Sequence, residues 1–163
     1  MWELQIDGGP AWSSMSGGLA FAPGGSQGAR PVLLVADDGK DAVHVVDVVG
    51  RVHLGYLADP GSIAGPRGVA VSAAAHLVAV SSRGRMVPYG HVSLYRGRAG
   101  GCEWDLVRVI GRGLLALSRP LLSRPSGLRF TGDGAMLAVA ASVGAAMRVM
   151  AIIIARFMAA TPA

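Results

Sequence analysis

Residue types that carry out chemistry are sparse in this chain, and their spacing decides what they can do. Gly24-Gly25-Ser26-Gln27-Gly28 fits the Gly-x-Ser-x-Gly template, in which a hydrolase serine sits between a strand and a helix. Here the segment precedes an apolar β run, and no helical pattern follows, so we interpret it as a turn. Cys102 lies beside Glu103, whose negative charge disfavours a reactive thiolate. We therefore expect no catalytic residue.

Metal-ligating residue types occur without a metal-binding pattern. Asp37, Asp38 and Asp41 offer oxygens of the kind that Ca²⁺ prefers, but their spacing differs from that of an EF-hand loop. A solvated turn is therefore the favoured interpretation. The four histidines form no paired motif; they are His44, His53, His76 and His91. We expect neither a metal site nor a cofactor.

Charge is distributed unevenly along the sequence. Residues 1–65 carry three basic and seven acidic side chains, whereas residues 66–163 carry twelve arginines and three acidic side chains. A basic half of this kind can indicate an anionic partner. The alternative is a compositional bias toward Arg, Ala and Gly at ordinary surface positions, because the chain has fourteen Arg and one Lys.

The basic half supplies the candidate contacts to an anionic partner, which are Arg83, Arg85, Arg96, Arg98, Arg112, Arg119 and Arg124. The guanidinium group suits phosphate because it donates two hydrogen bonds in a fixed plane. We expect the arginines at 83 and 85 to lie at the opposite rim from those at 96 and 98, because successive turns of an antiparallel sheet alternate between its ends. A divided charge disfavours sequence-specific binding of nucleic acid.

Three segments repeat one pattern, in which a Gly and an apolar–x–apolar run precede a turn and a short apolar run. They start at Gly18, Gly68 and Gly127, at spacings of 50 and 59 residues. A recurrence on this scale indicates a repeat architecture. Two units each predict four short antiparallel strands, over residues 16–55 and 66–111. A third unit, over residues 125–141, starts in the same way.

The two ends of the chain fall outside the repeat. Residues 1–15 are expected to form a lead-in strand or loop. The pattern degrades after Ala141, and residues 142–163 form a divergent apolar tail. Three successive Ile at 152–154 favour a strand, whereas the flanking Ala and Met favour a helix; we lean toward a helix from Ala145 onward. The loss of pattern favours a truncated or mis-predicted reading frame over an extract from a longer protein.

At these residues the chain resembles the NHL-repeat family of β-propellers. Pro66-Arg67-Gly68-Val69-Ala70-Val71 matches the opening of the family's blade, Val35-Ala36-Asp37 its second element, and Val43-His44-Val45-Val46-Asp47 its third. The second unit departs from the family with Ser81-Ser82 where an acidic turn is expected. The resemblance covers about residues 16–140. It implies an all-β fold, an incomplete β-propeller of four-stranded antiparallel blades, followed by an irregular or helical tail.

The resemblance implies a non-catalytic interaction scaffold that binds a protein partner, or less favourably RNA, through its blade loops. The alternative is a fragment of a six-bladed, calcium-dependent propeller hydrolase of the gluconolactonase type, whose metal ligands include Asn, a residue that this chain lacks. We therefore expect no enzyme activity. An incomplete ring leaves sheet edges open, so self-association is expected.

Several sequence features bear on location. The segment Met1–Asp7 lacks the basic and apolar regions of a signal peptide. Arg148 and Arg156 interrupt the apolar C-terminal region, which is too short to form a spanning helix. The single cysteine excludes an internal disulfide. These features predict a cytoplasmic protein with no membrane partner.

Overall fold

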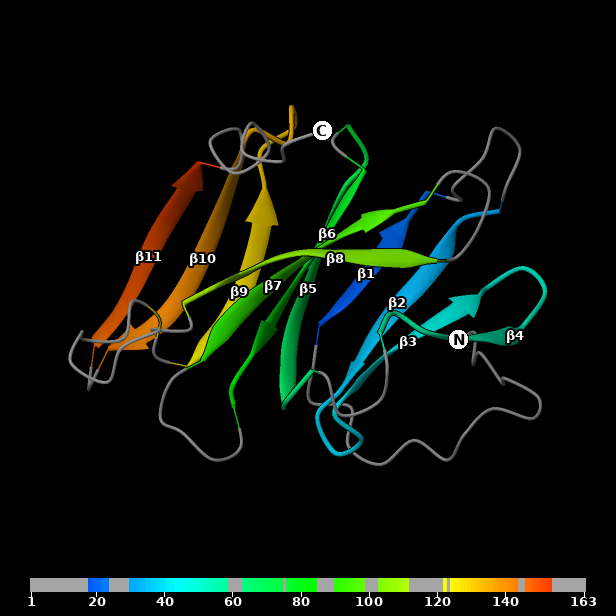
Figure 1. The fold of residues 1–163 in the computed structure, drawn as a ribbon, viewed down its shortest axis with the longest axis horizontal. Helices are drawn as coiled ribbons and strands as arrows, with labels where there is room; N and C mark the ends of the chain where they lie inside the picture. Colours follow the sequence, from blue (N-terminus) through cyan, green and yellow to red (C-terminus); the bar gives the residue numbers. More distant parts are fainter. Residues whose placement is uncertain are drawn as a thin grey trace, which may run out of the picture.

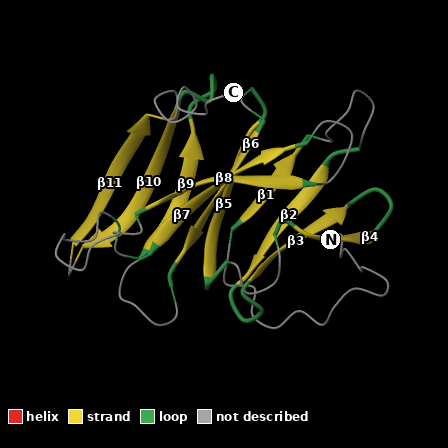
Figure 2. Ribbon diagram, viewed as in Figure 1, coloured by secondary structure: helices red, strands yellow, loops and turns green. Residues whose placement is uncertain are grey.

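The computed structural model describes residues 18–23, 30–58, 63–74, 76–84, 90–98, 103–111, 122, 124–143 and 146–153. Within these ranges the chain forms strands joined by turns and loops (Figure 2). The lead-in residues 1–15 and the last ten residues lie outside them, as do Ser26 and Cys102.

The strands form three antiparallel sheets that lie side by side (Figure 1). Each sheet contains strands that follow one another in the sequence, which is the arrangement of propeller blades. Blade 1 comprises β1 (Leu19–Ala22), β2 (Val32–Asp37), β3 (Ala42–Asp47) and β4 (Val52–Tyr56). Blade 2 comprises β5 (Pro66–Ser72), β6 (Leu77–Ser82), β7 (His91–Gly97) and β8 (Trp104–Ile110). Blade 3 comprises β9 (Pro125–Phe130), β10 (Met136–Val143) and β11 (Ala146–Ile153).

Short polar side chains stabilise the turns between neighbouring strands. Asp47 Oδ1 accepts hydrogen bonds from the backbone N–H of Val49 and Gly50 at 2.9 Å each and so holds the β3–β4 turn. In the β9–β10 turn, Asp133 accepts one from the N–H of Ala135 at 3.0 Å. These are the local bonds that make Asp a frequent turn residue.

The apolar core consists of two layers, each between adjacent blades. The first layer joins the buried side chains of blade 1, such as Leu34 and Val45, to Val78 and Val80 of blade 2. The second layer joins blade 2 to Leu137, Val139 and Ala141 of blade 3. Because each blade buries its faces against its neighbours, the stability of one blade depends on the next.

The inner strands approach one another most closely at glycines. A Cβ on Gly18 would lie 2.9 Å from Val69 N, and one on Gly68 would lie 2.2 Å from Ser126 O. Gly18 N–H also donates a hydrogen bond of 2.6 Å to Arg67 O, which joins β1 to β5. Glycine at the start of the first two units therefore permits the backbones of neighbouring blades to touch.

The expectation of a helix from Ala145 onward is wrong. Residues Ala146–Ile153 form β11, which pairs with β10 without interruption from Met136↔Ile153 to Val143↔Ala146. The tertiary pairing with β10 outweighs the helical propensity of the Ala and Met residues. Blade 3 therefore extends beyond residue 141, and its third strand replaces the helical or irregular tail over residues 146–153.

Candidate functional site

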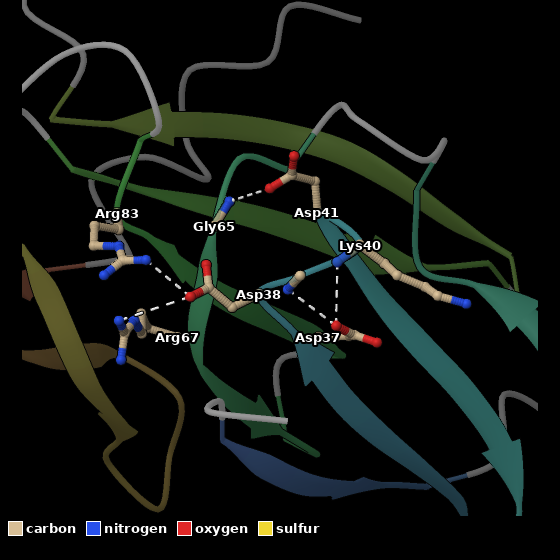
Figure 3. A network of polar contacts seen from close by, with 8 residues as sticks. Asp37, Asp38, Lys40, Asp41, Gly65, Arg67 and Arg83 are labelled. Carbon is tan, nitrogen blue, oxygen red and sulfur yellow. Dashed lines mark hydrogen bonds and ion pairs between the residues drawn. The ribbon is translucent and has the colours of Figure 1, made fainter. Parts of the chain in front are cut away.

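The β2–β3 turn carries the acidic cluster that the sequence placed in a solvated turn (Figure 3). That interpretation is wrong for Asp37, whose side chain is completely buried. Its Oδ1 accepts hydrogen bonds from the N–H of Gly39 at 3.0 Å and of Lys40 at 3.1 Å. The carboxylate thus closes the turn from inside the blade.

Asp38 and Asp41 use the same turn to hold blade 1 against blade 2 (Figure 3). Asp38 Oδ2 lies 2.9 Å from Arg83 Nη2 and 3.7 Å from Arg67 Nη2. Asp41 Oδ1 accepts a hydrogen bond of 2.8 Å from Gly65 N–H. These contacts give the acidic turn a structural role, and they neutralise Arg83, one of the arginines proposed from the sequence to contact an anionic partner.

A second polar cluster lies on the face of blade 1 that points away from blade 2. It is formed by Asp37, His44, His53 and Tyr56. His44 is completely buried, with Nε2 3.4 Å from Asp37 Oδ2 and Nδ1 3.0 Å from His53 Nε2. The Tyr56 ring lies about equally far from both imidazoles, with centroid distances of 5.1 and 5.2 Å. The register explains the cluster, because His44 lies opposite Tyr56 on β4 and opposite Val35, two residues before Asp37 on β2.

The hydrogen-bond partners define the tautomers of the two histidines. A carboxylate only accepts, so His44 Nε2 carries the hydrogen that points toward Asp37. Nδ1 of neutral His44 is then an acceptor, and His53 Nε2–H is the donor to it. Burial lowers the pKa of His44, and the neighbouring His53 lowers it further, although the hydrogen bond to Asp37 opposes this. Burial also lowers the pKa of His53, with a smaller contribution from Lys40.

We expect the protein to lose stability as the pH falls below about 6.5, the pKa of histidine in an unfolded chain. The folded state resists protonation because both pKa values are lowered, so the unfolded state binds more protons in the window below 6.5. The loss approaches at most about 1.4 kcal/mol per pH unit for each histidine, and it levels off below the folded pKa values. Urea unfolding at several pH values measures it.

His53→Gln tests the source of this pH dependence. Glutamine keeps an N–H donor for His44 but removes one titrating group, so the loss of stability on acidification should be smaller. Tyr56→Phe is the matched control, because it keeps both histidines and the aromatic ring. An unchanged pH dependence in His53→Gln would show that this pair is not its source.

The candidate arginines that the structure describes do not converge on one surface. In blade 2, Ser82 pairs with His91 at one end of the β6–β7 ladder, and Arg96 pairs with Leu77 at the other end. Arg83 therefore lies at the opposite end from Arg96 and Arg98, as the sequence predicted. Arg98 is held by Asp105 through Nε at 2.7 Å and by Glu103 through Nη1 at 3.2 Å. Arg124 directly precedes β9, whereas the candidates at 85, 112 and 119 lie outside the described residues.

The pairing of Arg98 with Asp105 and Glu103 makes its guanidinium less suited to bind phosphate. Asp105 and Glu103 raise the pKa of Arg98, and Arg98 lowers the pKa of Asp105, so the guanidinium of Arg98 is already paired with the Asp105 carboxylate. We expect Arg83→Ala/Arg98→Ala to leave the affinity for single-stranded RNA unchanged. A titration at two salt concentrations checks this, since phosphate contacts make binding strongly salt dependent. A salt-dependent loss of affinity in the variant would restore the electrostatic hypothesis.

A hollow of about 440 Å³ lies between the inner strands of blades 2 and 3. β5 and the β5–β6 turn form one wall, through Val71 and Ala74, and β9 and the β9–β10 turn form the other, through Phe130 and Gly132. Exposed Arg129 also contributes to the lining. The sequence carries no signal for this hollow, because it arises where two segments about 60 residues apart in the chain lie side by side.

The described residues lack two further kinds of functional feature. They contain no group of three or more His, Cys, Asp or Glu side chains placed to hold a metal ion. Nor do they contain a helix of the length and apolar character needed to cross a membrane.

Comparisons with known proteins address the fold. No protein-family model matches the chain, and no curated protein matches it. Among solved structures, KlAtg21 in complex with the coiled coil of AgAtg16 is similar at a TM-score of 0.53 and 18% identity, over 82% of this chain and 39% of the other. The Dos1 propeller is similar at 0.53 and 7% identity, over 76% and 29%. Hydrazine synthase of Kuenenia stuttgartiensis is similar at 0.51 and 19% identity, over 75% and 36%.

At these identities the similarity shows the fold alone. The chain spans well under half the length of the structures that it matches. Together with three antiparallel sheets of consecutive strands, the similarity shows that the chain is all-β and forms part of a β-propeller.

Proposed function

We propose that this chain is a non-catalytic interaction scaffold that binds a protein partner at the hollow between blades 2 and 3. The observation that carries the proposal is the hollow itself. Its volume falls within the range of about 300–1,000 Å³ that is typical of binding sites. Its walls are strands and tight turns, so the frame is pre-organised, and pre-organisation reduces the entropy that binding costs.

The lining suggests the chemistry of the partner. Val71, Leu128 and Phe130 are among the residues that line the hollow, and each is partly exposed. Arg129 lies between Leu128 and Phe130 on β9, its exposed side chain alternates to the other face of the strand, and within the described ranges no acidic side chain forms an ion pair with it, so it places a positive charge at the edge of the hollow. A polypeptide segment with an acidic side chain flanked by apolar ones fits this combination. The KlAtg21 propeller, which was solved with a bound coiled coil, supports a protein partner by analogy of fold.

We also propose that the blades are of the NHL type. The support is local. The end of β2 is Val35-Ala36-Asp37, and Asp37 accepts a hydrogen bond from the turn that follows. The start of β5 is Pro66-Arg67-Gly68, which places Gly68 at the junction between blades 2 and 3. RNA is the less favoured partner, because Arg83 and Arg98 are paired with carboxylates.

Affinity capture with matched variants tests the scaffold function. Gly132→Trp adds a bulky side chain to the lining of the hollow, at a position where a Cβ meets nothing within 4 Å. Arg129→Glu reverses the charge of the lining. Leu106→Trp on the outer strand β8 and Arg51→Glu in the β3–β4 turn are the controls, because both positions are exposed and lie away from the hollow.

We expect one partner to be retained by the wild-type protein and both controls, and to be lost at least tenfold from both hollow variants. The purified partner must then reproduce the same order of affinities with the purified chain. The proposal is wrong if the hollow variants retain every partner as well as the controls do.

A further inference from the structure

The hollow between blades 2 and 3 runs along the backbone edges of two strands. Residues 69–74 line one wall and residues 128–132 line the other, so each wall consists of consecutive residues. Side chains of a strand alternate between its two faces, and consecutive residues share only the backbone edge. Among the described strands, β5 pairs only with β6, and β9 pairs only with β10 (Figure 1). The unpaired edge of β9 that borders the hollow is here called its free edge.

The hydrogen bonds of blade 3 identify which backbone groups of β9 face the free edge. Thr131 N–H donates to Met136 O at 3.0 Å, so this pair is a hydrogen-bonded position of the β9–β10 ladder. Such positions alternate along an antiparallel ladder, so Arg129 also directs its N–H and C=O toward β10. Leu128 and Phe130 direct theirs away from β10, and no other backbone group of the described residues bonds to them. The free edge thus presents two donors and two acceptors.

The side chains of β9 determine which strand would fit this edge. Leu128 and Phe130 pack toward blade 2, whereas Arg129 between them lies on the other face and is exposed. In an antiparallel strand added to β9, the residue opposite Arg129 shares its face, and an opposite charge there is favourable. The residues on either side of it lie opposite Leu128 and Phe130, where apolar side chains extend the packing. A segment with an acidic residue between two apolar ones fits this pattern.

We propose that the partner of the hollow binds as an extended segment that adds an antiparallel strand to the free edge of β9. Its acidic side chain lies opposite Arg129, and its apolar side chains lie opposite Leu128 and Phe130. Strand addition takes its affinity from main-chain hydrogen bonds and its specificity from alternate side chains. The antiparallel direction continues the order of the sheet. The inference rests on the proposed scaffold function, because it specifies how the hollow holds its partner.

Backbone methylation of a peptide probe tests this binding mode. The probe is the capped peptide Ac-Ser-Val-Glu-Val-Ser-NH2, titrated into the full chain. In the proposed register both Val residues exchange hydrogen bonds with β9, whereas the Glu N–H points away from it. N-methylation of both Val residues removes two hydrogen bonds and should weaken binding about tenfold or more. N-methylation of Glu is the matched control and should leave the affinity unchanged.

Amide hydrogen exchange provides a readout on the protein itself. The bound probe should slow the exchange of the N–H groups of Leu128 and Phe130, which face the free edge. The N–H of Arg129 is directed at β10 and should exchange at the same rate with and without the probe. Protection of Arg129 alone would contradict the proposed register.

A charge swap tests the residue opposite Arg129. The variant Arg129→Glu should lose the affinity for the Glu probe and gain affinity for Ac-Ser-Val-Lys-Val-Ser-NH2, because the opposite charges are then restored across the two strands. The wild-type chain should show the reverse preference. Equal affinities of both chains for both probes would overturn the proposed pairing.

The variant Gly132→Trp separates this inference from the scaffold function. If Gly132→Trp abolishes binding but N-methylation of both Val residues does not, the hollow holds the peptide without strand addition; the inference is then wrong, and the scaffold function stands. Failure of the wild-type chain to bind the probe, or an equal loss on methylation of Glu, would also overturn the inference. Affinity capture then decides the scaffold function separately.

Discussion

Replacing Gly68 with alanine is expected to destabilise the protein by about 3 kcal/mol or more, toward the upper end of what overpacking costs. The added Cβ would lie 2.2 Å from Ser126 O and 2.9 Å from Ser81 Oγ. The first of these atoms is backbone and cannot rotate away, so the inner strand of blade 3 must move. Chemical unfolding in urea measures the effect.

Gly132→Ala is the matched control, because a Cβ there meets nothing within 4 Å. Alanine restricts the unfolded chain more than glycine does, so this substitution should be neutral or slightly stabilising. Equal effects of the two substitutions would show that β5 and β9 do not depend on the close approach at Gly68.

The strands were predictable because their signals are local. After Gly18 and Gly68, the apolar residues either alternate with other residues or form continuous runs, and turn residues flank these runs. The eight strands of blades 1 and 2 therefore lie close to the positions expected from the sequence. β11 was not predictable in this way. Its Ala, Met and Ile residues suit either conformation, and the pairing with β10 that decides between them is a tertiary contact.

The polar clusters were missed for a related reason. Asp37, His44 and His53 lie on three different strands, and the register that brings them together is not apparent from their spacing. The ion pair between Asp38 and Arg83 joins residues 45 positions apart in the sequence. The position of Asp37 at the end of an apolar run could have marked it in the sequence. Its burial could not be predicted in this way, because it depends on the contact with the imidazole of His44 on the next strand.

The departure of blade 2 from the NHL pattern has a structural consequence. Ser81 stands where blade 1 has Ala36, and it is completely buried. Its hydroxyl accepts a hydrogen bond of 2.8 Å from Gly68 N–H and donates one of 3.2 Å to Ser126 O. Blades 2 and 3 are thus joined through a buried hydroxyl, whereas blades 1 and 2 are joined through the charged turn at Asp38 and Asp41.

Leu34→Ala should be among the most damaging substitutions in the layer between blades 1 and 2. Leu34 is completely buried and belongs to the apolar cluster that includes Val45, Val78 and Val80. Truncating a leucine at such a site leaves a cavity and typically costs about 2–5 kcal/mol. The total stability of a domain is only about 5–15 kcal/mol, so this loss should shift the urea midpoint by about 1.5 M if the denaturant dependence is about 2 kcal/mol/M.

Leu54→Ala provides the comparison in the same blade. Leu54 lies on the outer strand β4 and is 46% exposed, so its truncation removes little buried area and should cost less than about 1 kcal/mol. The difference between the two losses of stability measures how much the stability of blade 1 depends on its packing against blade 2. If Leu34→Ala cost no more than Leu54→Ala, the blades would not share one core. The repeat would then be a series of independent sheets, because only packing between blades makes a buried leucine costly to remove.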